Sequence, residues 1–75
     1  MITCLKGKII QKSPTSIVLD VGGIGYLLHI SMNTFENIPP LEKEAFIYSE
    51  MIVREDSITL YGFHSESERQ LFRLL

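Results

Sequence analysis

Apolar and polar residues alternate along most of the chain with the period of β-strands, and turn-forming residues separate the alternating stretches. We expect five strands, over residues 2–12, 16–21, 24–30, 44–53 and 57–63. In the first strand the alternation fails around Gly7, which predicts a bend or bulge at that glycine. In the second strand, Ile17, Leu19 and Val21 are the expected inward-facing residues.

The residues between these strands predict two hairpins and a short helix. Gly22 and Gly23 can both take positive φ, as a two-residue type I′ turn requires. Residues 31–38 are compatible with one or two helical turns, which the prolines at 39 and 40 would end. The polar break Arg54-Glu55-Asp56 predicts a second hairpin between the last two strands.

The last residues predict a helix over 65–75. Ser65 and Glu68 fit a capping box, in which each side chain accepts a hydrogen bond from the backbone amide of the other. The end of this helix is strongly apolar, with Leu71, Phe72, Leu74 and Leu75. Such a helix either plugs the open end of a barrel formed by the five strands or continues into a further domain. We expect the second arrangement, with the chain as the front part of a longer protein.

The order of elements favours one mainly-β fold. Five strands with a short helix between the third and fourth are typical of the OB-fold, a five-stranded Greek-key barrel. We expect this barrel over residues 1–64, followed by an exit helix.

Composition limits the chain to one small folded domain. Its 75 residues are 45% hydrophobic, and its net charge of −2 disfavours unspecific coating of DNA. The single cysteine, Cys4, has no partner for an internal disulfide and is expected to be a small buried residue. No long apolar run or signal peptide is visible, so we expect a cytoplasmic protein.

No pattern of residues predicts catalysis, a metal or a cofactor. The glycines near Tyr26 do not complete a dinucleotide-binding motif, and His29 and His64 lack the spacing of a metal site. Most strand aromatics are expected in the core, although an OB-fold can use some to stack bases. These are Tyr26, Phe46, Tyr48, Tyr61 and Phe63. The alternating lysines at 6, 8 and 12 are expected to form an ordinary solvated face.

Glu55 and Asp56 are the most distinctive polar pair. Glycosidase chemistry needs two carboxylates facing each other across a cleft, which neighbours at a hairpin tip do not provide. From the residues alone, the pair is expected to solvate a turn.

Several segments together closely resemble the N-terminal part of the RuvA family, bacterial proteins that recognise Holliday junctions. The segments that carry the resemblance are Met1-Ile2, Leu5-Lys6-Gly7, Asp20-Val21-Gly22-Gly23-Ile24-Gly25-Tyr26, Val53-Arg54-Glu55-Asp56, Leu60-Tyr61-Gly62-Phe63, Glu68-Arg69 and Leu71-Phe72. The resemblance is collinear over the whole chain. In combination, these segments are much more specific than any one of them.

The resemblance implies a non-catalytic DNA-binding module for recombination and DNA repair. Glu55 and Asp56 match the family's acidic pin, a hairpin tip near the centre of an open four-way junction. Residues 65–75 would begin a second domain, whose helix-hairpin-helix motifs grip DNA phosphates. The implied partners are junction DNA, further copies in a homotetramer or octamer, and the hexameric motor RuvB, which binds a C-terminal domain absent from these 75 residues. No cofactor is implied.

An alternative from another functional class stays open. A small barrel of this kind could serve only in protein assembly, with the acidic tip as an inert turn and the apolar end helix as a docking element.

Overall fold

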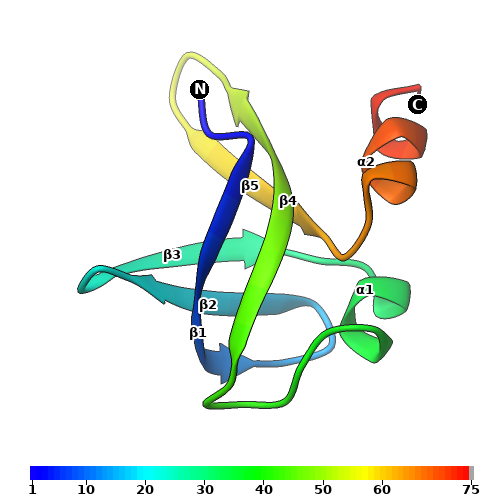
Figure 1. Ribbon diagram of the computed structural model, residues 1–75. Helices are drawn as coiled ribbons and strands as arrows, with labels where there is room; N and C mark the ends of the chain where they lie inside the picture. The colour runs from blue at the N-terminus through cyan, green and yellow to red at the C-terminus, as the bar shows by residue number, and fades with distance from the viewer. Residues whose placement is uncertain (75) are drawn as a thin grey trace.

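The computed structural model describes residues 1–74 and forms a closed five-stranded barrel (Figure 1). Leu75, which the sequence places in the last helix, lies outside the described residues. The elements are β1 (Cys4–Lys12), β2 (Ser16–Val21), β3 (Ile24–His29), α1 (Met32–Glu36), β4 (Glu44–Val53), β5 (Ile58–Phe63) and α2 (Glu66–Arg73). All five predicted strands and both helices are confirmed, with ends that differ by one or two residues.

The strands follow the order β1-β2-β3-β5-β4 around the barrel. All neighbouring pairs are antiparallel except β3 and β5, which run parallel and meet where His29 pairs with Tyr61. The pairing of β1 with β4 closes the barrel. This mainly-β architecture, with α1 between β3 and β4, is the expected OB-fold barrel.

The core lies inside the barrel and is built from the inward-facing residues of four strands. It consists of Ile9, Ile17, Leu19, Leu28, Ala45 and Ile47. Ile17 and Leu19 are fully buried, as predicted, and Val21 is half-buried against the core. Burying each large aliphatic side chain contributes about 1.5–3 kcal/mol, which is the main source of stability here.

The predicted irregularity in β1 occurs at a different residue. The register against β2 shifts between Ile9 and Gln11, so the extra residue is Ile10 and not Gly7. Pairing with β4 is regular through Gly7. Gly7 instead allows close approach, because a Cβ there would lie 2.4 Å from the carbonyl oxygen of Asp20. Gly7 therefore marks a close approach of β1 to β2 and not a bulge.

The glycine hairpin is confirmed in detail. Gly22 and Gly23 have φ of 61° and 92°, so both occupy the left-handed region that a type I′ turn needs. The Asp20 carboxylate accepts a hydrogen bond from the amide of Gly23 at 2.9 Å. This contact fixes the turn that joins β2 to β3.

Both helices begin at a serine cap, but the capping box of α2 is only half formed. The Ser65 hydroxyl accepts from the amide of Glu68, as predicted. The Glu68 carboxylate does not return to Ser65; it accepts from three side chains near α1, which are Ser31, Asn33 and Thr34. The prediction was wrong here because a tertiary partner outcompetes the local one.

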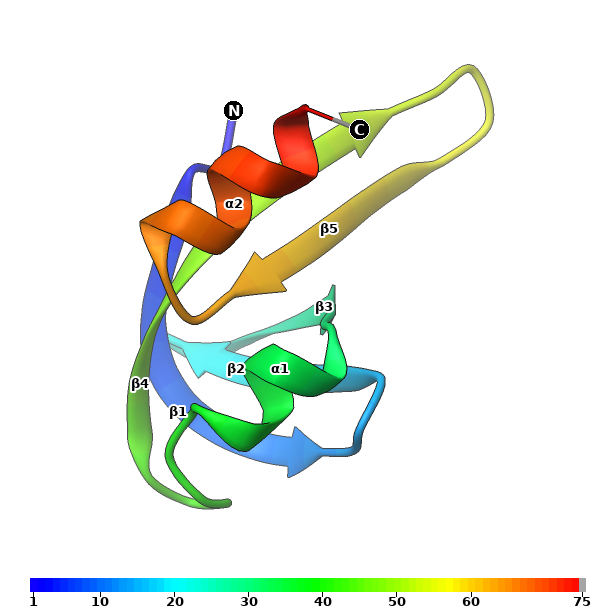
Figure 2. The ribbon, with the colours of Figure 1, turned by 90° about the vertical axis from the view of Figure 1, so that its right-hand side faces the viewer.

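The two helices lie on the same side of the molecule, with α2 against β4 and β5 (Figures 1 and 2). Phe72 of α2 packs its ring against Tyr61 and Phe63, with centroids 5.1 Å apart in each pair. Leu71 and Leu74 remain exposed. Within residues 1–74, neither helix has the length and apolar character to cross a membrane.

Candidate nucleic-acid interface

Glu55 and Asp56 lie at the tip of the β4–β5 hairpin, which reaches beyond the rest of the barrel (Figure 2). The ladder between the two strands runs to the pair Val53 and Ile58. Beyond it, the amide of Arg54 donates to the carbonyl oxygen of Ser57 at 2.8 Å. The two acidic residues therefore occupy the turn itself.

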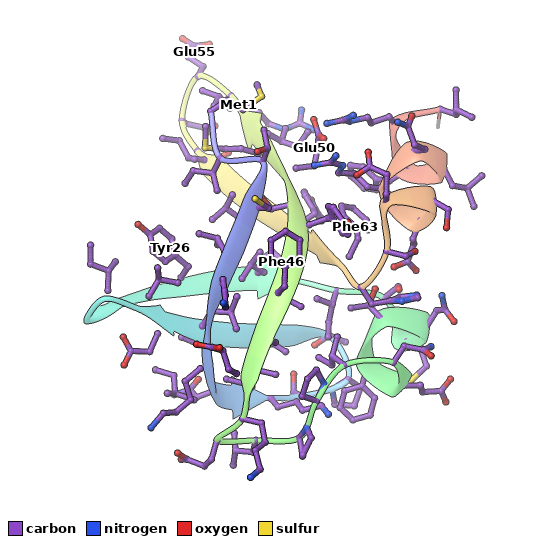
Figure 3. All side chains as sticks on the ribbon, viewed as in Figure 1. Met1, Tyr26, Phe46, Glu50, Glu55 and Phe63 are labelled. Atoms are coloured by element: carbon purple, nitrogen blue, oxygen red, sulfur yellow. The ribbon has the colours of Figure 1, made fainter. Side chains whose placement is uncertain are left out.

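The tip presents its charges directly to solvent. Every residue from 53 to 58 is exposed, and the side chain of Glu55 points away from the molecule (Figure 3). Within the described part of the chain, neither Glu55 nor Asp56 forms an ion pair. Arg54 is the neighbouring cation, so the three charges sum to −1. The carboxylates are free to act on an approaching charged group.

The base of this hairpin is braced by α2 and by the start of the chain. Arg73 of α2 donates from Nε to Glu50 of β4 at 2.7 Å. The hydroxyl of Ser49 donates to the carbonyl oxygen of Ile2 at 2.9 Å. The amide of Ser49 donates to the carbonyl oxygen of Thr3. These contacts fix the direction in which the hairpin leaves the barrel.

Arg69 is the centre of the contacts that hold α2. Its guanidinium donates to both carboxylate oxygens of Glu66, at 2.5 and 2.7 Å, and to the carbonyl oxygen of Thr3 at 2.8 Å. It also lies 5.2 Å from the ring centre of Tyr48. The hydrogen bond to Glu66 raises the pKa of Arg69 and lowers that of Glu66, while partial desolvation opposes both shifts.

Glu68 is the second polar anchor between α2 and the barrel. Burial acts to raise the pKa of Glu68, but hydrogen bonds from Thr34, Ser31 and Asn33 outweigh it and hold the pKa below its usual value. The ring of His64 hydrogen-bonds to Asn33 at 3.1 Å and belongs to the same cluster. The sequence does not reveal this cluster, because the residues of α1 and those around the start of α2 lie more than 30 positions apart.

The lysines of β1 do not form a basic strip. Nζ of Lys6 lies 3.9 Å from a carboxylate oxygen of Glu44, and Nζ of Lys8 lies 3.8 Å from one of Glu42. All four side chains are well exposed. Lys12 lies beyond the bulge, where it donates to the carbonyl oxygen of Pro39 and sits over the ring of Phe35. The expectation of an ordinary solvated face holds for Lys6 and Lys8.

The aromatic residues are only partly buried. Phe63 is buried, whereas Tyr26, Tyr48 and Tyr61 are half-buried and Phe46 is 50% exposed. Phe46 stands on the outer face of the barrel, edge-on to Tyr48 (Figure 3). The prediction that most aromatics fill the core is therefore wrong, because only Phe63 is buried and only Tyr26 packs against the core cluster. Phe46 departs furthest from it, since its strand position faces outward.

The structure contradicts one expectation about a reactive group. Cys4 is exposed at the start of β1, so the prediction of a buried cysteine is wrong. It precedes the first inward-facing residue and stays on the outer side with Lys6. Among residues 1–74, no three His, Cys, Asp or Glu side chains converge as metal ligands.

Arg69 is a structural anchor that was not predicted from the sequence, although the sequence holds a signal for it. Glu66 and Arg69 are three residues apart, the spacing of an ion pair on a helix. That spacing predicts the pair. It does not predict that the guanidinium also reaches the first strand.

Known proteins resemble this chain along its whole length. The family model described as RuvA N terminal domain matches residues 1–62. A protein of Coxiella burnetii (strain Dugway 5J108-111) is 47% identical over all 75 residues, and one of Christiangramia forsetii is 51% identical over the same span. A protein of Neisseria meningitidis serogroup B is 44% identical over the same span. Each is named Holliday junction branch migration complex subunit RuvA.

The alignments place this chain within part of those longer proteins. All 75 residues are covered, but they span only 38–39% of the length of these curated relatives. The match includes both the acidic hairpin and α2. The fold, the family model and these identities together show that the chain belongs to the RuvA family.

Proposed function

We propose that this chain is the N-terminal domain of a subunit that binds four-way DNA junctions in a branch-migration complex. The observation that carries the proposal is the pair Glu55 and Asp56, exposed at the end of a projecting hairpin in a chain of the RuvA family. We propose that these carboxylates act as an acidic pin at the centre of the junction.

Attraction to DNA would come from elsewhere. The chain has a net charge of −2, and Lys6 and Lys8 are matched by nearby carboxylates. We propose that a downstream domain, beginning with α2, grips the phosphates. The braced contacts of Arg69 and Arg73 with the barrel support this arrangement, because they would hold that domain at a set angle to the pin.

Repulsion by the pin would select the geometry of the DNA. A carboxylate and a phosphate repel each other strongly within about 10 Å at 0.1 M salt. Four copies arranged around an open junction would bring their tips together at its centre, where no phosphate backbone needs to cross. A continuous linear duplex would have to cross there. The pin would therefore weaken duplex binding more than junction binding.

The ATP hydrolysis that drives strand movement would take place in a partner protein. In this proposal the subunit is non-catalytic and works in the cytoplasm, as a tetramer or octamer, during recombination and repair. ATP hydrolysis would be carried out by the motor RuvB. The RuvA subunits would hold the junction open and guide separating strands past the pins into new arms.

A gel-shift titration tests the proposal. A synthetic four-way junction and a matched linear duplex are titrated with this chain. The same titrations are made with a longer protein, in which this chain continues to the full length of its relatives. We expect the longer protein to bind the junction selectively and this chain to bind weakly, because of its net negative charge. If the longer protein binds neither DNA, the proposal fails and a barrel used only for assembly becomes the better explanation.

Charge variants of the longer protein test the pin. Glu55→Gln with Asp56→Asn should strengthen duplex binding about tenfold, or ~1.4 kcal/mol, and reduce junction preference. Glu36→Gln removes one charge from an exposed position outside the tip and is the control for each of the two single tip substitutions. Unchanged selectivity in the tip variant would count against the pin.

A further inference from the structure

Two large apolar side chains stand exposed directly beneath the acidic tip. Val53 is 63% exposed and Ile58 is 69% exposed. They are paired across the last rung of the β4–β5 ladder, so both side chains lie on the same face of the hairpin. Arg54 and Ser57 form the next rung toward the tip and therefore lie on the opposite face.

This apolar pair extends a surface that begins in the core. Met51 and Leu60 are paired two residues further down the same face, and both are half-buried. Leu60 packs against the core cluster. We call Met51, Val53, Ile58 and Leu60 the apolar ridge. It runs from the barrel interior to the carboxylates, and its outer half is exposed within the described structure.

The charges around the outer half of the ridge restrict which part of a DNA molecule can contact it. Glu55 and Asp56 repel phosphate, so DNA can contact the outer half of the ridge only through its uncharged parts. The exposed face of a DNA base is uncharged, flat and apolar, so it can pack against the two aliphatic side chains beneath the carboxylates.

We infer that Val53 and Ile58 form a wedge that packs against base faces at the centre of the junction, an inference that rests on the proposed function. Base pairs beside a crossover have lost a stacking neighbour on one side. Aliphatic side chains that enter such a step replace part of the lost stacking and hold the bases apart. The tip thus acts on DNA in two ways, with carboxylates facing phosphates and the ridge facing bases.

The wedge explains why the projecting strands keep large apolar residues in water. A tip that acted only through repulsion would work equally well on polar strand residues such as threonine. Threonine is also β-branched and suits an exposed strand. Val53→Thr with Ile58→Thr therefore removes the apolar contact while preserving the hairpin and both pin carboxylates.

The experiment uses a four-way junction with 2-aminopurine beside the crossover, titrated with the subunit at the full length of its relatives. Unstacking of 2-aminopurine raises its fluorescence. We expect the natural protein to raise it and the double threonine variant to lose about half of that rise or more. Ile24→Thr with Leu27→Thr, two exposed apolar positions on β3, should keep the full rise. Circular dichroism confirms that each variant folds, and the two single threonine variants should give intermediate rises.

The outcomes separate the wedge from the proposed function. A full rise with the double threonine variant, or an equal loss with the β3 control, would overturn the wedge. If the natural protein selects the junction without any rise, the wedge is wrong and the proposed function stands. If the natural protein shows no preference for the junction, the proposed function fails first and the wedge fails with it.

Discussion

The guanidinium of Arg69 donates to the carbonyl oxygen of Thr3 at 2.8 Å and so joins the last helix to the residue before the first strand, 66 positions earlier. The same group holds Glu66 through two hydrogen bonds. Thr3 in turn accepts from the amide of Ser49 in the strand that leads to the acidic tip. One side chain thus connects the orientation of α2 to the base of the hairpin.

Replacing this guanidinium should loosen that connection. Lysine keeps the charge at position 69 but lacks the planar fork that binds both Glu66 oxygens while also donating to Thr3. Arg69→Lys should therefore lower the midpoint of urea unfolding. Arg73→Lys is the matched control, since Arg73 is the more exposed of the two and makes one ion pair. Equal losses in the two variants would contradict a special role for Arg69.

Glu68 should make stability depend on pH. Its pKa lies below the usual value of 4.5 in the folded protein, so the unfolded chain binds the proton more readily. Its contribution is present above the unfolded pKa and is lost as the pH falls through the folded pKa. Urea unfolding from pH 7 downward measures this effect.

The variant Glu68→Gln isolates that contribution from other carboxylates. At pH 7 it should unfold more easily by about 1 kcal/mol, the scale of a partly exposed hydrogen bond to a charged group. The difference from the natural protein should shrink as the pH falls below 4.5. Glu36→Gln, at an exposed position on α1, is the control. A gap that stays constant with pH would show that the ionised carboxylate of Glu68 is not the cause.

Two glycines provide a matched test of close packing. A Cβ on Gly7 would lie 2.4 Å from a backbone oxygen and 2.9 Å from a methyl group of Val21. Gly7→Ala should therefore cost about 2–4 kcal/mol, since β1 and β2 must separate. A Cβ on Gly25 meets only Val18, at 3.4 Å. Gly25→Ala should change the free energy of unfolding by less than about 1 kcal/mol. Thermal or urea unfolding gives the loss of unfolding free energy for each variant. Similar losses for Gly7→Ala and Gly25→Ala would contradict a special role for the close approach at Gly7.

Local patterns were sufficient to predict most of the fold. Alternation placed all five strands, and the two glycines at 22 and 23 predicted a turn that both residues form with positive φ. The patterns failed where a contact between distant residues decided the outcome. Gly7 lies against the backbone of β2 at Asp20, and Glu68 is bound by side chains around α1. Neither partner is visible in a local window.

The candidate site was predicted through family resemblance more than through chemistry. Two acidic residues at a polar break predict only a solvated turn, and the structure gives them no buried environment that would mark a site. What the sequence did not reveal was the geometry around them. Only the strand register shows that Val53 and Ile58 share one face beneath the carboxylates.

Salt should reveal whether the acidic tip acts through charge. The Debye length falls from about 10 Å at 0.1 M salt to about 3 Å at 1 M, so repulsion between carboxylates and phosphates is screened. The advantage of Glu55→Gln with Asp56→Asn in duplex binding should therefore be largest at low salt and shrink steadily as salt rises. Affinity itself also falls with salt, which makes the ratio between variant and natural protein the quantity to measure.

That ratio distinguishes electrostatic repulsion from a change in shape. Fluorescence anisotropy with the longer subunit and a linear duplex, at several salt concentrations below 0.3 M, would give it directly. A ratio that falls toward one supports repulsion by Glu55 and Asp56. A ratio that does not change with salt would mean that the substitutions act by altering the turn between Arg54 and Ser57, and the charge mechanism would have to be abandoned.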